Sequence, residues 1–143
     1  KISGPILDRF DLHIEVGSAD DNYNYDHVLT GELDGESSAD IAERVKAAQK
    51  IQQERYEGYN IRLNNALDGQ LLIDYAVPVD EGRDMLNEAA KKFRLSMRGY
   101  NRVLRVARTI ADLDNSKWVK KMHIAEALRY RQLDFLNTHV EMP

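Results

Sequence analysis

The stretch that most constrains the fold is residues 96–113, which read SMRGYNRVLRVARTIADL. Its apolar residues recur at the spacing that places side chains on one face of an α-helix. Val103, Ala107 and Ile110 form this stripe, and Leu104 and Ala111 widen it. A helix with so broad an apolar face is stable only when neighbouring elements cover it. The stretch therefore predicts a long helix around which a helical bundle is organised.

The same stretch carries arginines on a face beside the apolar stripe. Arg98, Arg102 and Arg105 follow one another there at helical spacing. Ser96 is suited to cap the helix, which places Arg98 in the first turn. The positive end of the helix dipole disfavours a cation at that position by up to about 1 kcal/mol. Folding does not require this arginine, so we interpret it as a residue that faces an anionic ligand.

Similar patterns predict the other helices. Residues 37–56 begin with two serines suited to capping, and Ile41, Val45, Ala48 and Gln52 trace one face. Asp80 is expected to cap a helix that follows Val77-Pro78. The expected helices are thus residues 37–56, 70–75, 80–93, 96–113 and 121–130. The residues expected to face inward from the two helices beside the central one are Met85, Leu86, Ala89, Phe93, Ile124, Ala127 and Leu128.

The N-terminal region predicts a strand instead. Leu12, Ile14 and Val16 alternate with polar residues, which is typical of a half-buried β-strand. A lone strand is unstable, so it should be disordered, lie on the helices or pair with another copy. Residues 131–143 are expected to trail along the surface or fray. The predicted organisation is residues 1–16 with the strand, a linker at residues 17–36, and a helical domain at residues 37–143.

Length and composition limit the class of protein. A chain of 143 residues can bury a core without crosslinks, and the absence of cysteine excludes disulfides and thiolate metal sites. No apolar run reaches membrane-spanning length, and no signal peptide is visible. The chain begins at Lys1 without an initiator methionine, so we expect it to be a piece of a longer protein.

The net charge of −4 conceals an uneven distribution. Residues 1–90 hold 8 basic and 19 acidic residues, whereas residues 91–143 hold 12 basic and 5 acidic ones. An acidic chain is a poor nucleic-acid binder overall, yet its basic part is able to contact phosphates. The alternative is that the two oppositely charged parts attract each other and have no further role.

Sequence motifs exclude several kinds of active site. No G-x-x-x-x-G-K, G-x-G-x-x-G or H-E-x-x-H pattern is present, and the histidines are too scattered for a metal site. A second arginine candidate is Arg9, which lies between Asp8 and Asp11 just before the expected strand. It is either a surface residue paired with those carboxylates or a guanidinium presented to a phosphate, a ligand that its planar fork suits.

Three segments, in order, carry a resemblance to a known family. KISGPILDRFDLHIEV, GESSADIAERVKAAQ and LSMRGYNRVLRVARTIADL resemble the C-terminal part of Mg-chelatase-like AAA+ ATPases of the YifB/ComM group. The resemblance covers nearly the whole chain. It implies a helical lid domain, preceded by a single leftover strand of the ATPase core.

The resemblance also implies roles for the arginines. Arg9 matches the arginine finger, which reaches the nucleotide of the neighbouring subunit and stabilises charge on its γ-phosphate. Arg98 matches the sensor 2 residue, which contacts the γ-phosphate in its own subunit. Arg102 and Arg105 are further nucleotide-binding candidates, although they lie deeper in the helix. No metal ligands are expected in this chain.

The parts that bind ATP and Mg²⁺ would lie upstream of Lys1, so the fragment alone is expected to hold no cofactor and to be inactive. For the full-length protein the resemblance implies a cytoplasmic, homo-oligomeric ring, with a hexamer as the expected size and no membrane partner. Its expected function is ATP hydrolysis coupled to DNA remodelling or branch migration in competence or recombination.

Two other functions remain open. The run from Lys91 to Arg108 has seven basic residues and no acidic one, which favours an autonomous helical DNA-binding module. The fold analogy also allows a chelatase-type motor that remodels a metal-insertion partner.

Overall fold

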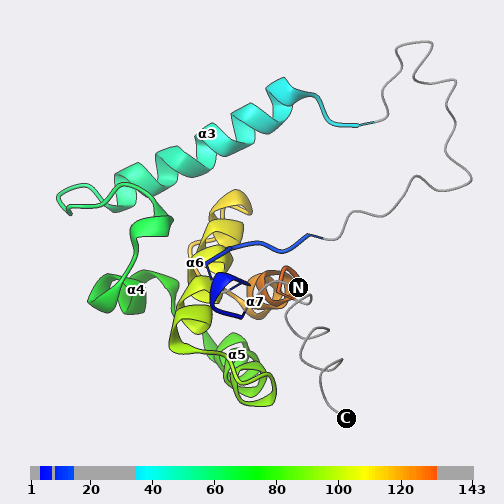
Figure 1. The fold of residues 1–143 in the computed structure, drawn as a ribbon. Helices are drawn as coiled ribbons and strands as arrows, with labels where there is room; N and C mark the ends of the chain where they lie inside the picture. Colours follow the sequence, from blue (N-terminus) through cyan, green and yellow to red (C-terminus); the bar gives the residue numbers. More distant parts are fainter. Residues whose placement is uncertain (1–3, 8, 15–34, 132–143) are drawn as a thin grey trace, which may run out of the picture.

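The computed structural model of the chain describes residues 4–7, 9–14 and 35–131. These residues form a bundle of helices, and none of them lies in a β-strand (Figure 1). The prediction of a mainly α-helical fold is therefore confirmed. In chain order the elements are α1 (Gly4–Leu7), α3 (Ser38–Arg55), the 3-10 turn η1 (Asn64–Ala66), α4 (Gly69–Ala76), α5 (Asp80–Lys92), α6 (Met97–Leu113) and α7 (Lys121–Arg129).

Helix α6 lies at the centre of this bundle and contacts α3, η1, α4 and α7. Its ends are set by local hydrogen bonds. The hydroxyl of Ser96 accepts a bond from the backbone N–H of Gly99 at 3.0 Å, as the sequence predicts. At the other end Asn115 adopts a left-handed conformation with φ of 51°, and the N–H of Ser116 donates to the carbonyl of Ala111 at 2.8 Å. This pattern satisfies carbonyls that the helix end would otherwise leave unbonded.

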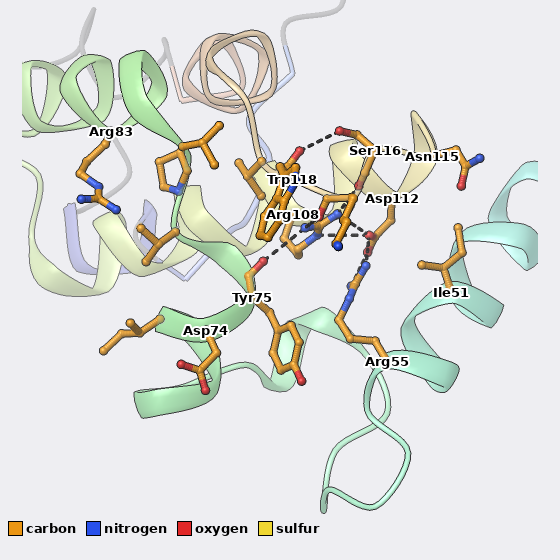
Figure 2. Close-up of a pocket in the computed structure, with 16 residues that line it drawn as sticks. Ile51, Arg55, Asp74, Tyr75, Arg83, Arg108, Asp112, Asn115, Ser116 and Trp118 are labelled. Carbon is orange, nitrogen blue, oxygen red and sulfur yellow. Dashed lines mark hydrogen bonds and ion pairs between the residues drawn. The ribbon is translucent and has the colours of Figure 1, made fainter.

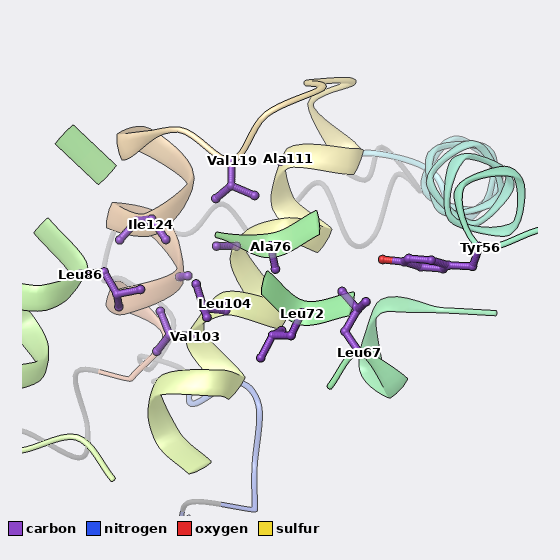
Figure 3. Close-up of a cluster of buried hydrophobic side chains, with 12 residues drawn as sticks. Tyr56, Leu67, Leu72, Ala76, Leu86, Val103, Leu104, Ala111, Val119 and Ile124 are labelled. Carbon is purple, nitrogen blue, oxygen red and sulfur yellow. The ribbon is translucent and has the colours of Figure 1, made fainter. Parts of the chain in front are cut away.

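The core forms where α4 and α7 meet the apolar stripe of α6 and where α5 packs against α7 (Figure 3). Val103, Leu104, Ala107 and Ala111 of α6 are buried, which confirms most of the predicted stripe, while Ile110 is half-buried. The small alanines let the neighbouring helices approach α6 closely. The residues that pack against them from other elements are Leu72, Ala76, Leu86, Val119, Ile124 and Ala127.

Helix α3 is only partly attached to this core. The predicted face is buried at Ala48 and Gln52, but Ile41 and Val45 are 45% and 43% exposed. Figure 1 shows why: the C-terminal half of α3 lies against the bundle, and the N-terminal half extends away from it. The periodicity therefore predicts the helix and its apolar face correctly, but not how far along that face the bundle reaches.

The N-terminal segment lies on the helices without forming a strand in its described part. Leu12 and Ile14 are exposed, and the backbone N–H of His13 donates to the carbonyl of Tyr130 at 2.7 Å. A strand needs a neighbouring strand to bond with, and the described residues provide none. The rest of the predicted strand, Glu15 and Val16, lies outside the described residues, as do residues 17–34 of the predicted linker.

Two details of the sequence prediction are wrong. Asp80 is the first residue of α5, and Val79 occupies the capping position before it. Arg131, the first residue of the segment expected to lie on the surface or fray, is only 1% exposed. Its backbone N–H donates to the carbonyl of Leu128 at 3.0 Å, so it continues directly from the end of α7. Residues 132–143 lie outside the described part of the chain.

The unequal burial of these apolar side chains predicts unequal effects of truncation. Leu86→Ala should lower the free energy of unfolding by about 2–5 kcal/mol, because it empties a fully buried site. Ile41→Ala, the matched control on the extended half of α3, should change it by less than about 0.5 kcal/mol. Urea denaturation of both variants measures the difference, and equal losses would contradict the described path of α3.

Candidate functional site

The start of α6 presents an exposed cation on an uncompensated helix end. Arg98 lies in the first turn, which contains no acidic residue. Its side chain is exposed and makes no ion pair with the described residues. The positive end of the dipole and the guanidinium therefore reinforce each other, which is unfavourable for folding but favourable for an anion placed there.

Arg9 lies in a segment that an ion pair attaches to α6. It is exposed and follows α1, where its backbone N–H donates to the carbonyl of Ile6 at 3.0 Å. Asp11, a partner considered for Arg9, is instead paired with Arg102. Because Arg102 lies one turn after Arg98, this ion pair attaches the segment that carries Arg9 near the start of α6. Asp8, the other partner considered, lies outside the described residues.

The other two arginine candidates are engaged inside the fold. Arg102 binds Asp11, as described above, and Arg105 donates from Nε to the carbonyl of Leu67 at 2.7 Å. These bonds attach the N-terminal segment and the loop before α4 to the same helix. Of the three arginines predicted on one face of α6, Arg98 alone has an exposed side chain without a partner among the described residues.

A second set of charged residues was not predicted as a unit. The side chain of Asp112 is fully buried, and its carboxylate accepts hydrogen bonds from three side chains. Figure 2 shows two of the donors, Arg55 and Arg108. Arg55 of α3 donates from Nη1 at 3.0 Å, and Arg108 donates from Nη2 at 2.9 Å. Asn64 of η1 donates from Nδ2 at 2.8 Å. We call Arg55, Asn64, Arg108 and Asp112 the Asp112 cluster.

Within this cluster every N–H of Arg108 has a partner. Its Nε hydrogen and one Nη2 hydrogen are donated to Asp112, and the remaining donors reach three backbone carbonyls. These carbonyls belong to Tyr75 at 3.3 Å, Ser116 at 2.7 Å and Lys117 at 3.0 Å. A planar guanidinium has five N–H donors, so this site uses its full capacity. Arg108 thereby connects α6 to the end of α4 and to the turn before α7.

The pKa values of Arg55 and Arg108 are shifted in opposite directions, although both guanidinium groups bind the carboxylate of Asp112. Burial lowers the pKa of Arg108, and repulsion from Arg55 adds to this effect against the attraction of Asp112. Burial acts on the pKa of Arg55 in the same direction, but the interactions of its guanidinium with Asp112 and Tyr56 together outweigh burial, so this pKa is raised. The side chain of Arg108 is also the more deeply buried of the two, at 3% exposed against 14% for Arg55.

The sequence did contain a signal for the Asp112 cluster. Leu104, Arg108 and Asp112 follow at intervals of four, so both charged residues lie on the buried face rather than on the face of Arg98. Arg108 is also the last member of the basic run that begins at Lys91, and membership of that run gives no indication that its side chain is buried. A charged pair on an apolar stripe indicates a buried ion pair, but the sequence does not identify Arg55 as its second cation.

The described histidines have structural contacts rather than metal-ligating ones. His123 is buried, accepts a bond at Nδ1 from the backbone N–H of Lys120 at 2.9 Å and lies 2.9 Å from Asp114 through Nε2. It therefore caps the start of α7. Among the described residues, no group of His, Cys, Asp or Glu is arranged to hold a metal, and no helix has the length and apolarity needed to cross a membrane.

Comparison with known proteins identifies relatives along nearly the whole chain. Residues 35–131 match the family described as magnesium chelatase, subunit ChlI C-terminal. Competence protein ComM of Haemophilus influenzae is 39% identical over 138 residues, and the uncharacterized protein YifB of Escherichia coli is 36% identical over 141. These matches cover 93% and 99% of this chain, but only 25% and 26% of the relatives. The chain thus spans about a quarter of their length.

The Asp112 cluster predicts a large effect of removing its one carboxylate. Asp112→Ala should lower the free energy of unfolding by about 3–5 kcal/mol, because two buried guanidinium groups lose their counter-charge. Asp84→Ala, which removes an exposed carboxylate from α5, is the matched control and should change it by less than about 0.5 kcal/mol. Thermal and urea unfolding compare the two, and similar values would contradict the role of the cluster.

Proposed function

The chain belongs to the family of the C-terminal domain of the magnesium chelatase subunit ChlI, and we propose that it is the helical lid of a ring-forming AAA+ ATPase. In this proposal residues 1–16 are the end of the ATPase core, residues 17–36 are a linker and residues 37–143 are the lid domain. The ATPase works in the cytoplasm as a homo-oligomeric ring, with six subunits as the expected number.

The observation that supports this proposal is the exposed position of the Arg98 side chain at the start of α6. This guanidinium lies in the first turn of α6, without an acidic neighbour in that turn or a partner among the described residues. Such a group suits the γ-phosphate of ATP, because charge-assisted bidentate bonds to phosphate oxygens are strong. In the proposed role of sensor 2, Arg98 binds that phosphate and so makes the lid position depend on hydrolysis.

Arg9 has the complementary role of an arginine finger toward the neighbouring subunit. Its support is its exposure and the attachment of its segment to α6 through Asp11 and Arg102. The attachment limits the conformations of the segment, so less entropy is lost when the guanidinium meets a phosphate. Arg102 and Arg105 then position the segments around the site, and ATP and Mg²⁺ are bound by parts of the protein outside this chain.

We propose DNA as the substrate of the ring, with remodelling or branch migration in competence or recombination as its action. The support is the name of one relative, competence protein ComM. A chelatase-type motor is supported by the family description alone.

Substitution of the two exposed arginines in the full-length protein tests the proposed ATPase roles. Arg9→Ala should reduce ATP turnover by about 10³-fold or more while nucleotide binding remains, because a finger acts on the transition state in the neighbouring subunit. Arg98→Ala should reduce turnover and also weaken the change in lid position on nucleotide binding. Turnover, nucleotide affinity and lid movement by fluorescence energy transfer are the measurements.

Arg62→Ala is the matched control, because Arg62 is exposed in the loop between α3 and η1. It should leave all three quantities unchanged. Wild-type turnover in Arg9→Ala would contradict the finger, and unchanged turnover and lid movement in Arg98→Ala would contradict the sensor.

A second candidate function is direct DNA binding by this domain. Lys91, Lys92, Arg94 and Arg98 are exposed where α5 meets α6, so one corner of the bundle is strongly basic. The other three arginines of the basic run are engaged inside the fold. Four exposed cations in a chain with a net charge of −4 favour weak binding at most.

We therefore expect the chain alone not to shift a short DNA duplex in a native gel, even at low salt. Lys91→Glu combined with Lys92→Glu is the diagnostic variant, since it reverses half of the basic corner. A salt-sensitive shift by the wild-type chain that this variant loses would contradict our expectation and establish the corner as a DNA-binding surface.

A further inference from the structure

An open pocket lies at the other end of α6 from Arg98. It has a volume of about 730 Å³ and is lined by the C-terminal part of α3, by α4, by the segment that leads into α5, and by the end of α6 with the turn that follows (Figure 2). Arg108 lines the pocket and lies ten residues after Arg98, which corresponds to about 15 Å along the helix. Ile73, Val79, Arg83, Lys117 and Trp118 are among the residues that line it, and we call this surface the Trp118 groove.

The polar residues deepest in this groove are already bonded to one another. Arg55, Arg108 and Asp112 line the pocket, but their hydrogen bonds lie within the Asp112 cluster or reach backbone carbonyls. None of the buried side-chain atoms that lack a partner in the described residues belongs to a lining residue. A small-molecule site needs convergent polar groups that are free to bind, so the groove does not suit a small polar ligand.

Large apolar side chains are exposed along the same groove. Ile73 of α4 is 58% exposed, Trp118 is 54% exposed and Val79 is 37% exposed. These three residues come from separate segments, yet all line one pocket. A grouped apolar surface of this kind favours contact with another apolar surface, and tryptophan often dominates the binding energy of such contacts.

The charges at the edge of the groove determine what kind of surface fits. Arg83 and Lys117 are exposed and form no ion pair with the described residues, and the ammonium of Lys117 lies 5.0 Å from the centre of the Trp118 ring. Asp74 is the exposed carboxylate of the lining and accepts a bond from Gln70 at 2.8 Å, so its one negative charge stands against the two positive charges of Arg83 and Lys117. The groove is therefore cationic at its edge although the whole chain carries a net charge of −4.

We propose that the Trp118 groove is a docking site for a peptide segment of a partner protein that carries large apolar side chains together with carboxylates. The apolar side chains cover Ile73, Val79 and Trp118, and the carboxylates meet Arg83 and Lys117. Two cations without an ion pair among the described residues, beside an apolar surface, suit such a segment better than a nucleic acid, which binds through many phosphate contacts. The proposal does not depend on Arg9 or Arg98, which lie outside the groove.

Selection from a random-peptide library against the whole chain tests this proposal. We expect the selected peptides to combine aromatic or aliphatic residues with Asp or Glu. Trp118 is the one tryptophan of the chain, so its fluorescence reports binding of a selected tryptophan-free peptide directly. Arg83→Glu combined with Lys117→Glu should weaken that binding by about tenfold or more, because like charges then face each other.

Lys46→Glu combined with Arg129→Glu is the matched control, since it makes the same change in net charge at exposed positions outside the groove. It should leave the affinity within about twofold, because distant surface charges are screened by salt. Selected peptides without acidic residues, no change in Trp118 fluorescence, or equal weakening by both double variants would overturn the proposal. Circular dichroism of each variant confirms that the fold is retained.

Discussion

The carboxylate of Asp112 is the group on which the arrangement of this bundle depends. Two guanidinium groups and an amide donate to it from α3, α6 and η1. Arg55 of α3 and Asn64 of η1 lie 57 and 48 residues before Asp112 in the chain. Burying a charge is costly unless it is paired and hydrogen-bonded, so each of these segments has to lie where it does. The surplus positive charge is compensated by the carbonyls of Tyr75, Ser116 and Lys117. A polar cluster therefore sets the orientation of α3, while the apolar core holds α4 and α7 against α6 and α5 against α7.

The arginines of helix α6 lie in different surroundings along its length. Its first turn presents Arg98 to solvent, its middle turns use Arg102 and Arg105 to attach neighbouring segments, and its last turns contain the Asp112 cluster. One helix thus carries four arginines in three different environments. The proposed phosphate contact belongs to the first turn, and the proposed docking groove borders the last. Because a helix is stiff over this length, the positions of the two surfaces are fixed relative to each other.

The sequence predicted the helices well because their determinants are local. Apolar spacing, serine caps and turn residues act within a few positions, so α3, α5, α6 and α7 appear close to their predicted bounds. It predicted the burial of side chains less well. The stripe of α3 looks continuous in the sequence, yet Ile41 and Val45 are exposed because no described part of the bundle extends that far. The alternating residues 12–14 form no strand, since a strand depends on partners elsewhere in the chain.

By itself, the sequence determined the helical class, the boundaries of the main helices, the unusual arginine at the start of α6 and the family resemblance that the comparisons confirm. The tertiary structure alone decided the surroundings of each arginine. Arg98, Arg102, Arg105 and Arg108 look alike in a basic run, but what surrounds each one is set by segments distant in the chain. Arg55 and Asp112 are 57 residues apart. Helix formation depends on neighbours along the chain, whereas pairing of buried charges depends on neighbours in space.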